Sequence, residues 1–216
     1  MRYTAPMTER TRPPADPPAS VLILAGGQSQ RLGQDKSLLV LAGQPLLVRT
    51  VHRLAALSDD LIVVTNQRQR YERFALPARL IPDERRGVGS LMGIYSGLQA
   101  AQHEHALAVA CDMPFLNLPL LRYMLSLVDD YDVVIPRLDG LLEPLHAVYS
   151  KACLPHIRSL LDQGQRQIIA FFDRVRVRYV ERDELDRFDP LHRSFMNVNT
   201  PADWECVQSL LEQNGH

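Results

Sequence analysis

Short apolar runs alternate with helix-patterned segments along much of this chain, and the alternation restricts the folds open to it. Buried strands are typically short β-branched and aliphatic runs, whereas apolar residues recurring every three or four positions indicate helices. Strands are expected at 21–24, 61–65, 80–81, 106–111, 132–136 and 145–149, with helices after Pro45, near Leu91 and from Pro119. The alternation predicts an α/β fold: a three-layer, Rossmann-like arrangement around a mainly parallel sheet with right-handed crossovers.

The pattern is less regular toward the C-terminus, where arginines at 174, 176 and 178 alternate with Val175, Val177 and Tyr179. Such alternation is typical of a half-exposed strand, so we expect an antiparallel edge to the sheet in this region. The arginines indicate either a solvated strand face or a basic groove for an acidic ligand.

Length and composition indicate one folded domain with a short N-terminal extension. The first 20 of the 216 residues hold five prolines and little apolar content, so we expect a flexible Pro-rich tail over 1–19 and a single domain over 20–216. A formal charge of −1 argues against general binding to nucleic acid or membrane surfaces. No secretory signal or long apolar run is visible, which favours a cytoplasmic protein. The three cysteines form no pair motif and are expected to be buried.

The first expected strand runs into a glycine-containing loop, VLILAGGQSQRLGQDK over residues 21–36. Gly26 and Gly27 let the backbone approach a phosphate, and Arg31 and Lys36 add positive charge at the carboxyl end of the strand. The spacing is neither a Walker A loop nor a Rossmann fingerprint. A triphosphate-binding loop is one interpretation, and an ordinary strand-to-helix turn with a surface Arg and Lys is the other.

Polar residues follow other expected strands and suit the rest of a nucleotide site. Asp112 ends the strand 106–111, where a carboxylate can hold Mg²⁺ against phosphate oxygens or can simply cap a turn. Asn66 and Asp83 each follow a strand, and their side chains suit a base or ribose, or else turn formation. His146 either lines an acceptor pocket or is a buried core residue.

These residues carry a family resemblance. LAGGQSQRLGQDK, from Leu24 to Lys36, resembles the nucleotide-binding loop of the molybdenum cofactor guanylyltransferases, nucleotidyltransferases with a glycosyltransferase-A-like α/β fold. The resemblance spans roughly residues 20 to 212 and includes Asn66, Asp83, the CDMP segment at 111–114 and NVNTP at 197–201. The segment 89–93 departs from it, because Ser90 replaces the usual proline; we expect Ser90 to cap the following helix.

The resemblance implies transfer of GMP from GTP to the terminal phosphate of molybdenum-bound molybdopterin, giving the guanine dinucleotide cofactor and pyrophosphate. It assigns the guanine nucleotide to Leu24, Ala25, Gly26, Gly27, Lys36, Asn66, Asp83 and Asp112, with Mg²⁺ on Asp112. Arg31 and Lys36 would offset the charge of the leaving pyrophosphate, so that together with Asp112 they form the expected catalytic set. The acceptor is expected to contact His146, Asn197 and Asn199. Expected partners are molybdenum cofactor delivery proteins and molybdoenzymes.

Other functions stay open at this point. Cytidylyl relatives carry Ala-Ala-Gly where this chain has Ala25, Gly26 and Gly27, so cytidylyl transfer to the same acceptor is a close rival. Nucleotidyl transfer to a sugar phosphate is a further possible enzymatic function. A nucleotide-dependent molybdopterin carrier is the non-enzyme alternative. Asp112 argues against it, because binding alone does not require a metal at the α-phosphate. Thr200 and Pro201 are also typical of the start of a helix, with Thr200 as N-cap, Pro201 at N1 and Asp203 at N3, close to a capping box.

Overall fold

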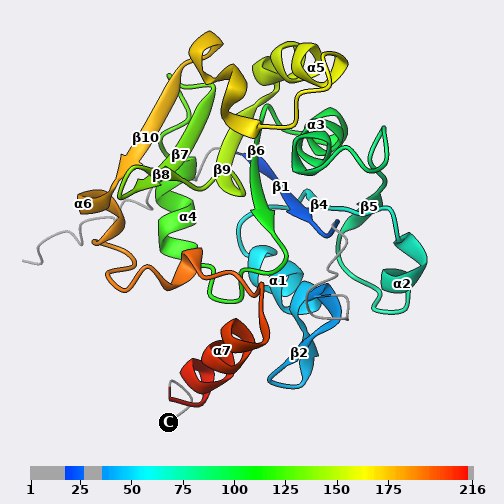
Figure 1. The fold of residues 1–216 in the computed structure, drawn as a ribbon, viewed down its shortest axis with the longest axis vertical. Helices are drawn as coiled ribbons and strands as arrows, with labels where there is room; N and C mark the ends of the chain where they lie inside the picture. Colours follow the sequence, from blue (N-terminus) through cyan, green and yellow to red (C-terminus); the bar gives the residue numbers. More distant parts are fainter. Residues whose placement is uncertain (1–17, 27–35, 214–216) are drawn as a thin grey trace, which may run out of the picture.

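The computed structural model describes residues 18–26 and 36–213, and it is built on a single large sheet (Figure 1). Eight strands take part, in the order β10-β7-β9-β6-β1-β4-β5, with β8 paired to β7. Their bounds are β1 Ala19–Leu24, β4 Leu61–Val64, β5 Arg79–Ile81, β6 His105–Ala110, β7 Val133–Leu138, β8 Leu141–Leu142, β9 His146–Ser150 and β10 Val177–Glu181. A separate two-stranded hairpin is formed by β2 Val40–Leu41 and β3 Gln44–Pro45. The fully buried β1 and β4 sequences are the continuous apolar runs that a central parallel strand requires.

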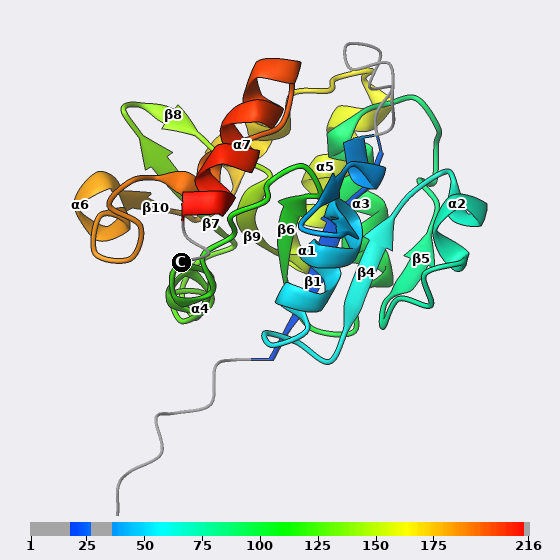
Figure 2. The ribbon, with the colours of Figure 1, turned by 90° about the horizontal axis from the view of Figure 1, so that it is seen from below.

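Helices cover both faces of this sheet, which gives three layers (Figures 1 and 2). The α-helices are α1 Leu46–Leu54, α2 Arg68–Glu72, α3 Ser90–Ala100, α4 Leu118–Leu125, α5 Leu154–Asp162, α6 Arg182–Leu185 and α7 Pro201–Gln213. Four 3₁₀ segments are η1 Lys36–Leu38, η2 Lys151–Cys153, η3 Ile168–Arg174 and η4 Arg193–Phe195. One core layer joins α1, α4 and α6 to the sheet, and the other joins α3, α5 and η3 to its opposite face. The predicted three-layer α/β fold is confirmed.

The direction of the strands confirms a mainly parallel sheet that also contains antiparallel pairs, but the antiparallel strand lies inside it. β1 pairs in parallel with both β4 and β6, and β4 pairs in parallel with β5. β9 runs antiparallel to its two neighbours, β6 and β7. The edge strand β10, which carries the alternating arginines, is parallel to β7. The reversal comes from the short connection through β8, which returns the chain beside β7, as antiparallel neighbours allow.

Local expectations are mostly met, with two corrections. Thr200 and Asp203 cap α7 reciprocally, since each backbone amide bonds the other side chain. Ser90 does not cap α3: it is the first helical residue, and the N-cap is Gly89 at φ 107° without a side-chain bond. Cys111 and Cys153 are buried as expected, but Cys206 is exposed on α7, which packs against the body through few residues.

The ends of the chain add little to these findings. Ala19 already belongs to β1 and is buried, whereas residues 1–17 of the expected tail lie outside the described residues. The division into a tail and one domain therefore stays a prediction. Among the described helices, none combines the length and apolar character that crossing a bilayer would need.

Candidate active site

The carboxyl ends of four parallel strands meet at one edge of the sheet, and the predicted nucleotide residues follow these ends. Backbone bonds continue beyond the strands and fix the turns: Ala25 N donates to Val64 O at 3.0 Å, and Thr65 N donates to Ile81 O at 2.8 Å. On the other side of β1, Cys111 N donates to Leu24 O at 3.2 Å. The turns after β1, β4, β5 and β6 are therefore held side by side, where open α/β sheets bind ligands.

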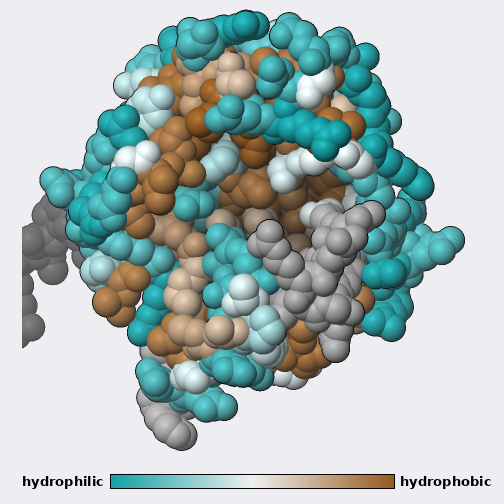
Figure 3. Space-filling model, in the orientation of Figure 1, coloured by the Kyte–Doolittle hydropathy of each residue, from teal (hydrophilic) through white to brown (hydrophobic). Residues whose placement is uncertain are grey.

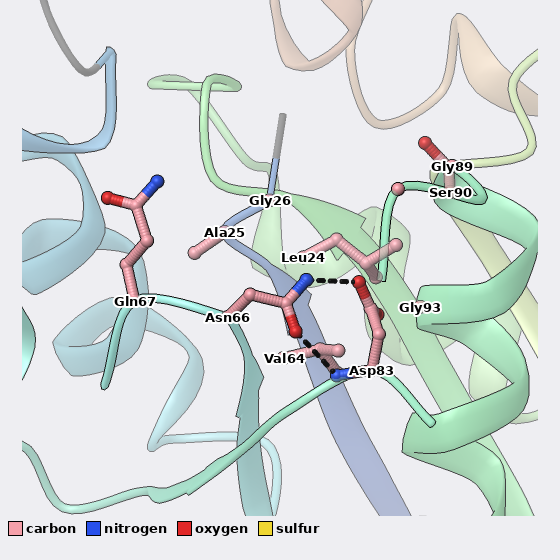
Figure 4. A pocket seen from close by; sticks show the side chains of 11 residues that line it. Leu24, Ala25, Gly26, Val64, Asn66, Gln67, Asp83, Gly89, Ser90 and Gly93 are labelled. Carbon is pink, nitrogen blue, oxygen red and sulfur yellow. Dashed lines mark hydrogen bonds between the residues drawn. The ribbon is translucent and has the colours of Figure 1, made fainter. Parts of the chain in front are cut away.

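A cavity of about 490 Å³ opens between these turns and the start of α3. Its lining combines apolar walls from the sheet with polar side chains and glycines: Leu24, Ala25, Gly26, Val64, Asn66, Gln67, Asp83, Gly87, Gly89, Ser90 and Gly93 (Figure 4). Figure 3 shows that this face of the molecule is hollowed near its centre and that apolar residues contribute to the hollow. A mainly apolar cavity with a few converging polar groups is the usual form of a small-molecule site.

Asn66 and Asp83 face each other inside this cavity and form a reciprocal pair (Figure 4). Asn66 Nδ2 donates to Asp83 Oδ2 at 2.6 Å, and the backbone N–H of Asp83 donates to Asn66 Oδ1 at 3.1 Å. The turn after β4 is thereby joined to the turn after β5. Burial raises the pKa of the Asp83 carboxyl, and the bond from Asn66 lowers it in part. The pair holds a half-buried carboxylate whose Oδ1 receives no bond from Asn66.

The N-terminal turn of α3 forms the wall opposite this pair. Gly89 enters the helix at φ 107°, a conformation that side chains rarely adopt. A Cβ built on Gly93 would stand 2.9 Å from Leu24 Cδ2 and 3.6 Å from Asp83 Oδ1. Glycine at position 93 therefore lets α3 lie directly against the β1 turn and the carboxylate.

A second cluster at the same sheet edge brings together three predicted residues. Lys36 Nζ donates to Asn199 Oδ1 at 2.6 Å and lies 3.4 Å from Asp112 Oδ2. The side chains of Lys36 and Asp112 are 15% and 20% exposed, so the charges are partly shielded from water but remain open to a ligand. The sequence reasoning had placed Lys36 with the nucleotide and Asn199 with the acceptor, and the two now share one contact.

The backbone around this cluster explains why distant segments meet. Val198 N donates to Asp112 O at 3.0 Å, so the NVNTP segment runs alongside the turn after β6. The Asp203 carboxylate accepts the N–H groups of both Asn199 and Thr200, at 2.9 and 2.8 Å. Val198 is fully buried in a small cluster with Leu41, Leu46 and Val207. The side chain of Asn199 is thus presented from a fixed loop.

The oxygen atoms of this cluster fit a hard divalent cation. The Asp112 carboxylate and the Asn199 amide oxygen both approach one positively charged group, the Lys36 ammonium. Mg²⁺ is commonly held by one or two carboxylates together with substrate phosphates and water, so a single protein carboxylate is enough. Within residues 18–26 and 36–213 no group of three or more His, Cys, Asp or Glu side chains could hold a metal without such a substrate. The donor set suits a metal that arrives with a nucleotide.

The remaining predicted residues lie in different places. Asn197 Nδ2 donates to Phe195 O at 3.2 Å, and no bond joins it to Lys36 among those described. His146 is fully buried on the α4 side of the sheet, against the Phe195 ring at a centroid distance of 4.9 Å. Burial lowers its pKa to about 4, and both ring nitrogens have no partner among the described residues. Gly27 and Arg31 lie outside the described residues.

Sequence reasoning did not assign several residues that line the cavity, among them Val64, Gln67, Gly89 and Gly93. Val64 and Gln67 flank Asn66 at the end of β4, so their contact with a ligand follows from the strand that positions Asn66. Gly89 and Gly93 bound the segment 89–93 that follows Asp83, and a Cβ at Gly93 would contact Leu24 of β1.

Fold and site together define a class: an α/β nucleotidyltransferase whose ligands bind at the carboxyl edge of a parallel sheet. Comparison with known proteins narrows this class. The sequence pattern of the MobA-like NTP transferase domain matches residues 21–179. The chain belongs to this family. Membership of a nucleotidyltransferase family points to a divalent metal cofactor, in keeping with the donor set around Asp112.

Individual relatives agree with this assignment. The chain is 38% identical to a probable molybdenum cofactor guanylyltransferase of Pelotomaculum thermopropionicum, over 91% of this chain and 95% of that protein. It is 36% identical to a molybdenum cofactor guanylyltransferase of Desulfosudis oleivorans, over 88% and 95%. Among solved structures, molybdopterin-guanine dinucleotide biosynthesis protein A of Archaeoglobus fulgidus superposes with a TM-score of 0.79 at 27% identity, covering 90% of this chain and 99% of that one.

Proposed function

We propose that this protein transfers GMP from GTP to the terminal phosphate of molybdenum-bound molybdopterin, forming molybdopterin guanine dinucleotide and releasing pyrophosphate. The observation that carries the proposal is the Lys36, Asp112 and Asn199 cluster at the sheet edge that also holds the nucleotide-sized cavity. Family membership and near full-length guanylyltransferase relatives at 36–38% identity support the same reaction.

The guanosine part of GTP would occupy the cavity over Leu24, Ala25 and Gly26. Guanine presents two adjacent N–H donors on its Watson–Crick edge, and a carboxylate is the acceptor that suits them. Asp83 offers an oxygen that Asn66 does not occupy, and Asn66 fixes the carboxylate in place. Burial of the pair strengthens such a bond relative to one in water. Asp83 would therefore accept hydrogen bonds from the guanine base. If the nucleoside bound in the opposite orientation, it would accept them from the ribose hydroxyls.

The triphosphate would extend from this cavity over the glycine loop toward Lys36. The Lys36 ammonium, together with Arg31 and the N–H groups of Gly26 and Gly27, would offset the charge of the departing pyrophosphate. Asp112, with Asn199 beside it, would hold Mg²⁺ against the phosphate oxygens. When bound there, the metal would offset negative charge at the α-phosphate.

The acceptor needs no general base from the protein. A phosphate monoester is largely ionised near neutral pH, so its oxygen is already a nucleophile and correct placement is what remains to be supplied. Asn199 and Asn197 would orient the acceptor, since the loop that carries them runs beside Asp112. This account leaves His146 without a proton-transfer role, in keeping with its complete burial.

Cytidylyl transfer is not favoured. The relatives named as molybdenum cofactor guanylyltransferases or probable ones are 32–38% identical, whereas a solved cytidylyltransferase from Thermus thermophilus shares 17% identity and supports the fold alone. A Cβ at Gly26 would meet no described heavy atom within 4 Å, so it would project into open pocket space. We expect Gly26→Ala to lower the ratio of GTP to CTP turnover, because the larger purine needs that space.

Replacing Asp112 tests the proposal. With molybdenum-loaded molybdopterin and Mg²⁺, the wild-type protein should release pyrophosphate with GTP and not with CTP. Asp112→Asn should lower this turnover by about 10³-fold or more, as loss of metal charge stabilisation implies, while part of the GTP binding remains. Asp129→Asn, at an exposed position before β7, is the matched control and should retain activity. Full turnover of Asp112→Asn would overturn the metal assignment, and GTP binding without any turnover of the wild type would favour a carrier.

Two further parts of the proposal concern the cell. GTP and the molybdenum cofactor as substrates go with a cytoplasmic location, which cell fractionation would check. Delivery proteins that bring the acceptor and molybdoenzymes that take the product are expected partners, and co-purification with the tagged full chain would test them.

A further inference from the structure

A second, smaller hollow lies beside the turn that follows Asp112, between that turn and α1. Its volume is about 160 Å³, about a third of that of the cavity beside Asn66 and Asp83. Its lining comes from the β3–α1 segment and from the chain before α4: Gln44, Leu46, Arg49, Thr50, His52, Arg53, Met113, Pro114 and Leu116. Figure 1 shows α1 next to the chain that leads into α4. Nothing in the proposed reaction uses this hollow.

Positive charge is concentrated in the hollow, and no carboxylate of the described residues pairs with it. Arg49 and Arg53 stand four residues apart on α1, so their side chains share one helix face. Among the described residues, neither arginine has a carboxylate within the 4.0 Å that defines an ion pair. Burial and the nearby charge of Arg49 lower the pKa of the Arg53 guanidinium. From Lys36 to Ser58 the chain contains no acidic residue at all.

The side chains of both arginines are also placed so that their N–H groups can donate hydrogen bonds to a ligand in the hollow. Arg53 Nε donates to the backbone oxygen of Leu116 at 2.6 Å, which ties the guanidinium across the hollow to the opposite wall. Arg49 Nε is a buried donor with no partner among the described residues. Leaving a buried charged donor unbonded is costly, so this atom indicates a missing acceptor. Thr50 and Gln44 add neutral polar groups to the same lining.

We infer that this hollow is a binding site for a phosphate-sized dianion, held by Arg49 and Arg53. The guanidinium fork matches the oxygens of phosphate, and two unpaired arginines on one face favour a doubly charged ligand. The small volume fits an ion or a terminal phosphate group. A docked protein segment would need a much larger surface, about 600–800 Å² on each partner. The inference does not depend on the proposed reaction.

Binding of inorganic phosphate to the full chain tests the site directly. Thermal unfolding is followed while phosphate replaces chloride at constant ionic strength. We expect a dissociation constant on the order of 1–10 mM and a rise in Tm of about 2–5 °C at saturation. Arg49→Gln and Arg53→Gln should each weaken phosphate binding about 10-fold, and Arg49→Lys should recover part of it. Arg166→Gln, at an exposed position between α5 and η3, should bind phosphate as the wild type does.

A Lys36→Ala background separates this site from the triphosphate site, since phosphate binding at Arg49 and Arg53 should persist there. Equal binding by the two Gln variants and the wild type, or the loss of all phosphate binding in Lys36→Ala, would overturn the inference. Absence of phosphate binding to the wild-type protein would overturn it as well.

Steady-state kinetics then identifies the source of the anion. If the site holds a phosphate of the acceptor, the Arg49→Gln and Arg53→Gln variants should raise the KM for acceptor about 10-fold at unchanged KM for GTP. If it holds a free anion, both KM values should stay constant while phosphate binding is weakened. Failure of the phosphate titration would leave the GTP reaction untouched, so the two proposals fail separately.

Discussion

The Lys36 ammonium donates to the Asn199 amide oxygen across 163 positions of sequence, at 2.6 Å. The contact joins the end of the glycine loop to the segment that precedes α7, and Asp112 shares the same ammonium at 3.4 Å. Nucleotide and acceptor would therefore meet at a single positive charge. In the proposed reaction, the charge that would hold GTP also contacts the residue proposed to face the acceptor, so two anionic substrates could be brought together.

Replacing Lys36 with alanine should weaken GTP binding by about 10- to 100-fold, the range expected for losing a charge-assisted contact. Binding is measured by calorimetry with Mg²⁺ and no acceptor, so that turnover does not interfere. Lys151→Ala removes the other lysine of the chain, at the start of η2, and should leave GTP affinity unchanged. An unchanged affinity in Lys36→Ala would remove this residue from the nucleotide site.

The contact could not be found from sequence, although the residues that form it could. Periodicity predicted β1, β4 and β6, and the parallel sheet that follows from them places Asn66, Asp83 and Asp112 along one edge. The contact between Lys36 and Asn199 depends instead on Val198, whose backbone bonds Asp112 and whose side chain packs on the start of α1. Tertiary packing of this kind has no periodic signal.

The internal position of the antiparallel strand was missed for a similar reason. β9 is short and fully buried, so its sequence alternates no more than that of a parallel strand. The direction of β9 is set by the tight turn through β8, and no residue pattern within β9 itself indicates that direction. His146 illustrates the same limit, since only the packing of Phe195 against it distinguishes a core histidine from one lining a pocket.

GTP affinity should depend on pH through Asp83. Burial raises the pKa of this carboxyl, and only its ionised form accepts two guanine donors. Affinity should therefore be constant above the raised pKa and should fall as the pH drops through it. Asn66→Ala removes the bond that lowers the pKa, so the fall should begin at a higher pH. GTP binding titrated from pH 8 to pH 5 would check both curves, and a profile that is the same in the two proteins would contradict the assignment of Asp83.

Two glycines on α3 should respond differently to alanine. At Gly97 a Cβ would stand 2.8 Å from Leu22 Cδ1, inside a fully buried core, so Gly97→Ala should destabilise the fold by ~1–3 kcal/mol. At Gly93 the Cβ would meet Leu24 Cδ2, whose side chain borders the cavity and can turn into it. Gly93→Ala should therefore change the free energy of unfolding by less than ~1 kcal/mol while weakening GTP binding.

Urea unfolding and GTP calorimetry on the same two variants would separate these effects. The comparison is matched, because helix propensity favours alanine equally at both positions, by up to ~1 kcal/mol. Loss of stability in Gly93→Ala with normal GTP binding in the remaining folded protein would show that Leu24 does not border the nucleotide.

His146 should make the fold sensitive to acid. Its pKa is about 4 in the folded protein and near 6.5 when unfolded, so the unfolded chain takes up a proton first as the pH falls. Stability is therefore complete above pH 6.5, declines between 6.5 and about 4, and has lost about 3 kcal/mol below that range, at 1.36 kcal/mol for each pKa unit. His146→Phe keeps a ring against Phe195 and removes the titration, so the variant should lose less stability over this range.

Urea unfolding at pH 7 and pH 4.5 measures the difference, with His156→Gln on α5 as the control for loss of an imidazole. Carboxylates titrate in both proteins and cancel, so the remaining difference reports position 146 alone. An equal loss of stability in wild type and His146→Phe would show that this histidine is not buried in its neutral form. A raised KM for the acceptor in His146→Phe, at unchanged stability, would assign the residue to the acceptor site instead, because only a side chain that reaches the ligand changes binding without changing the core.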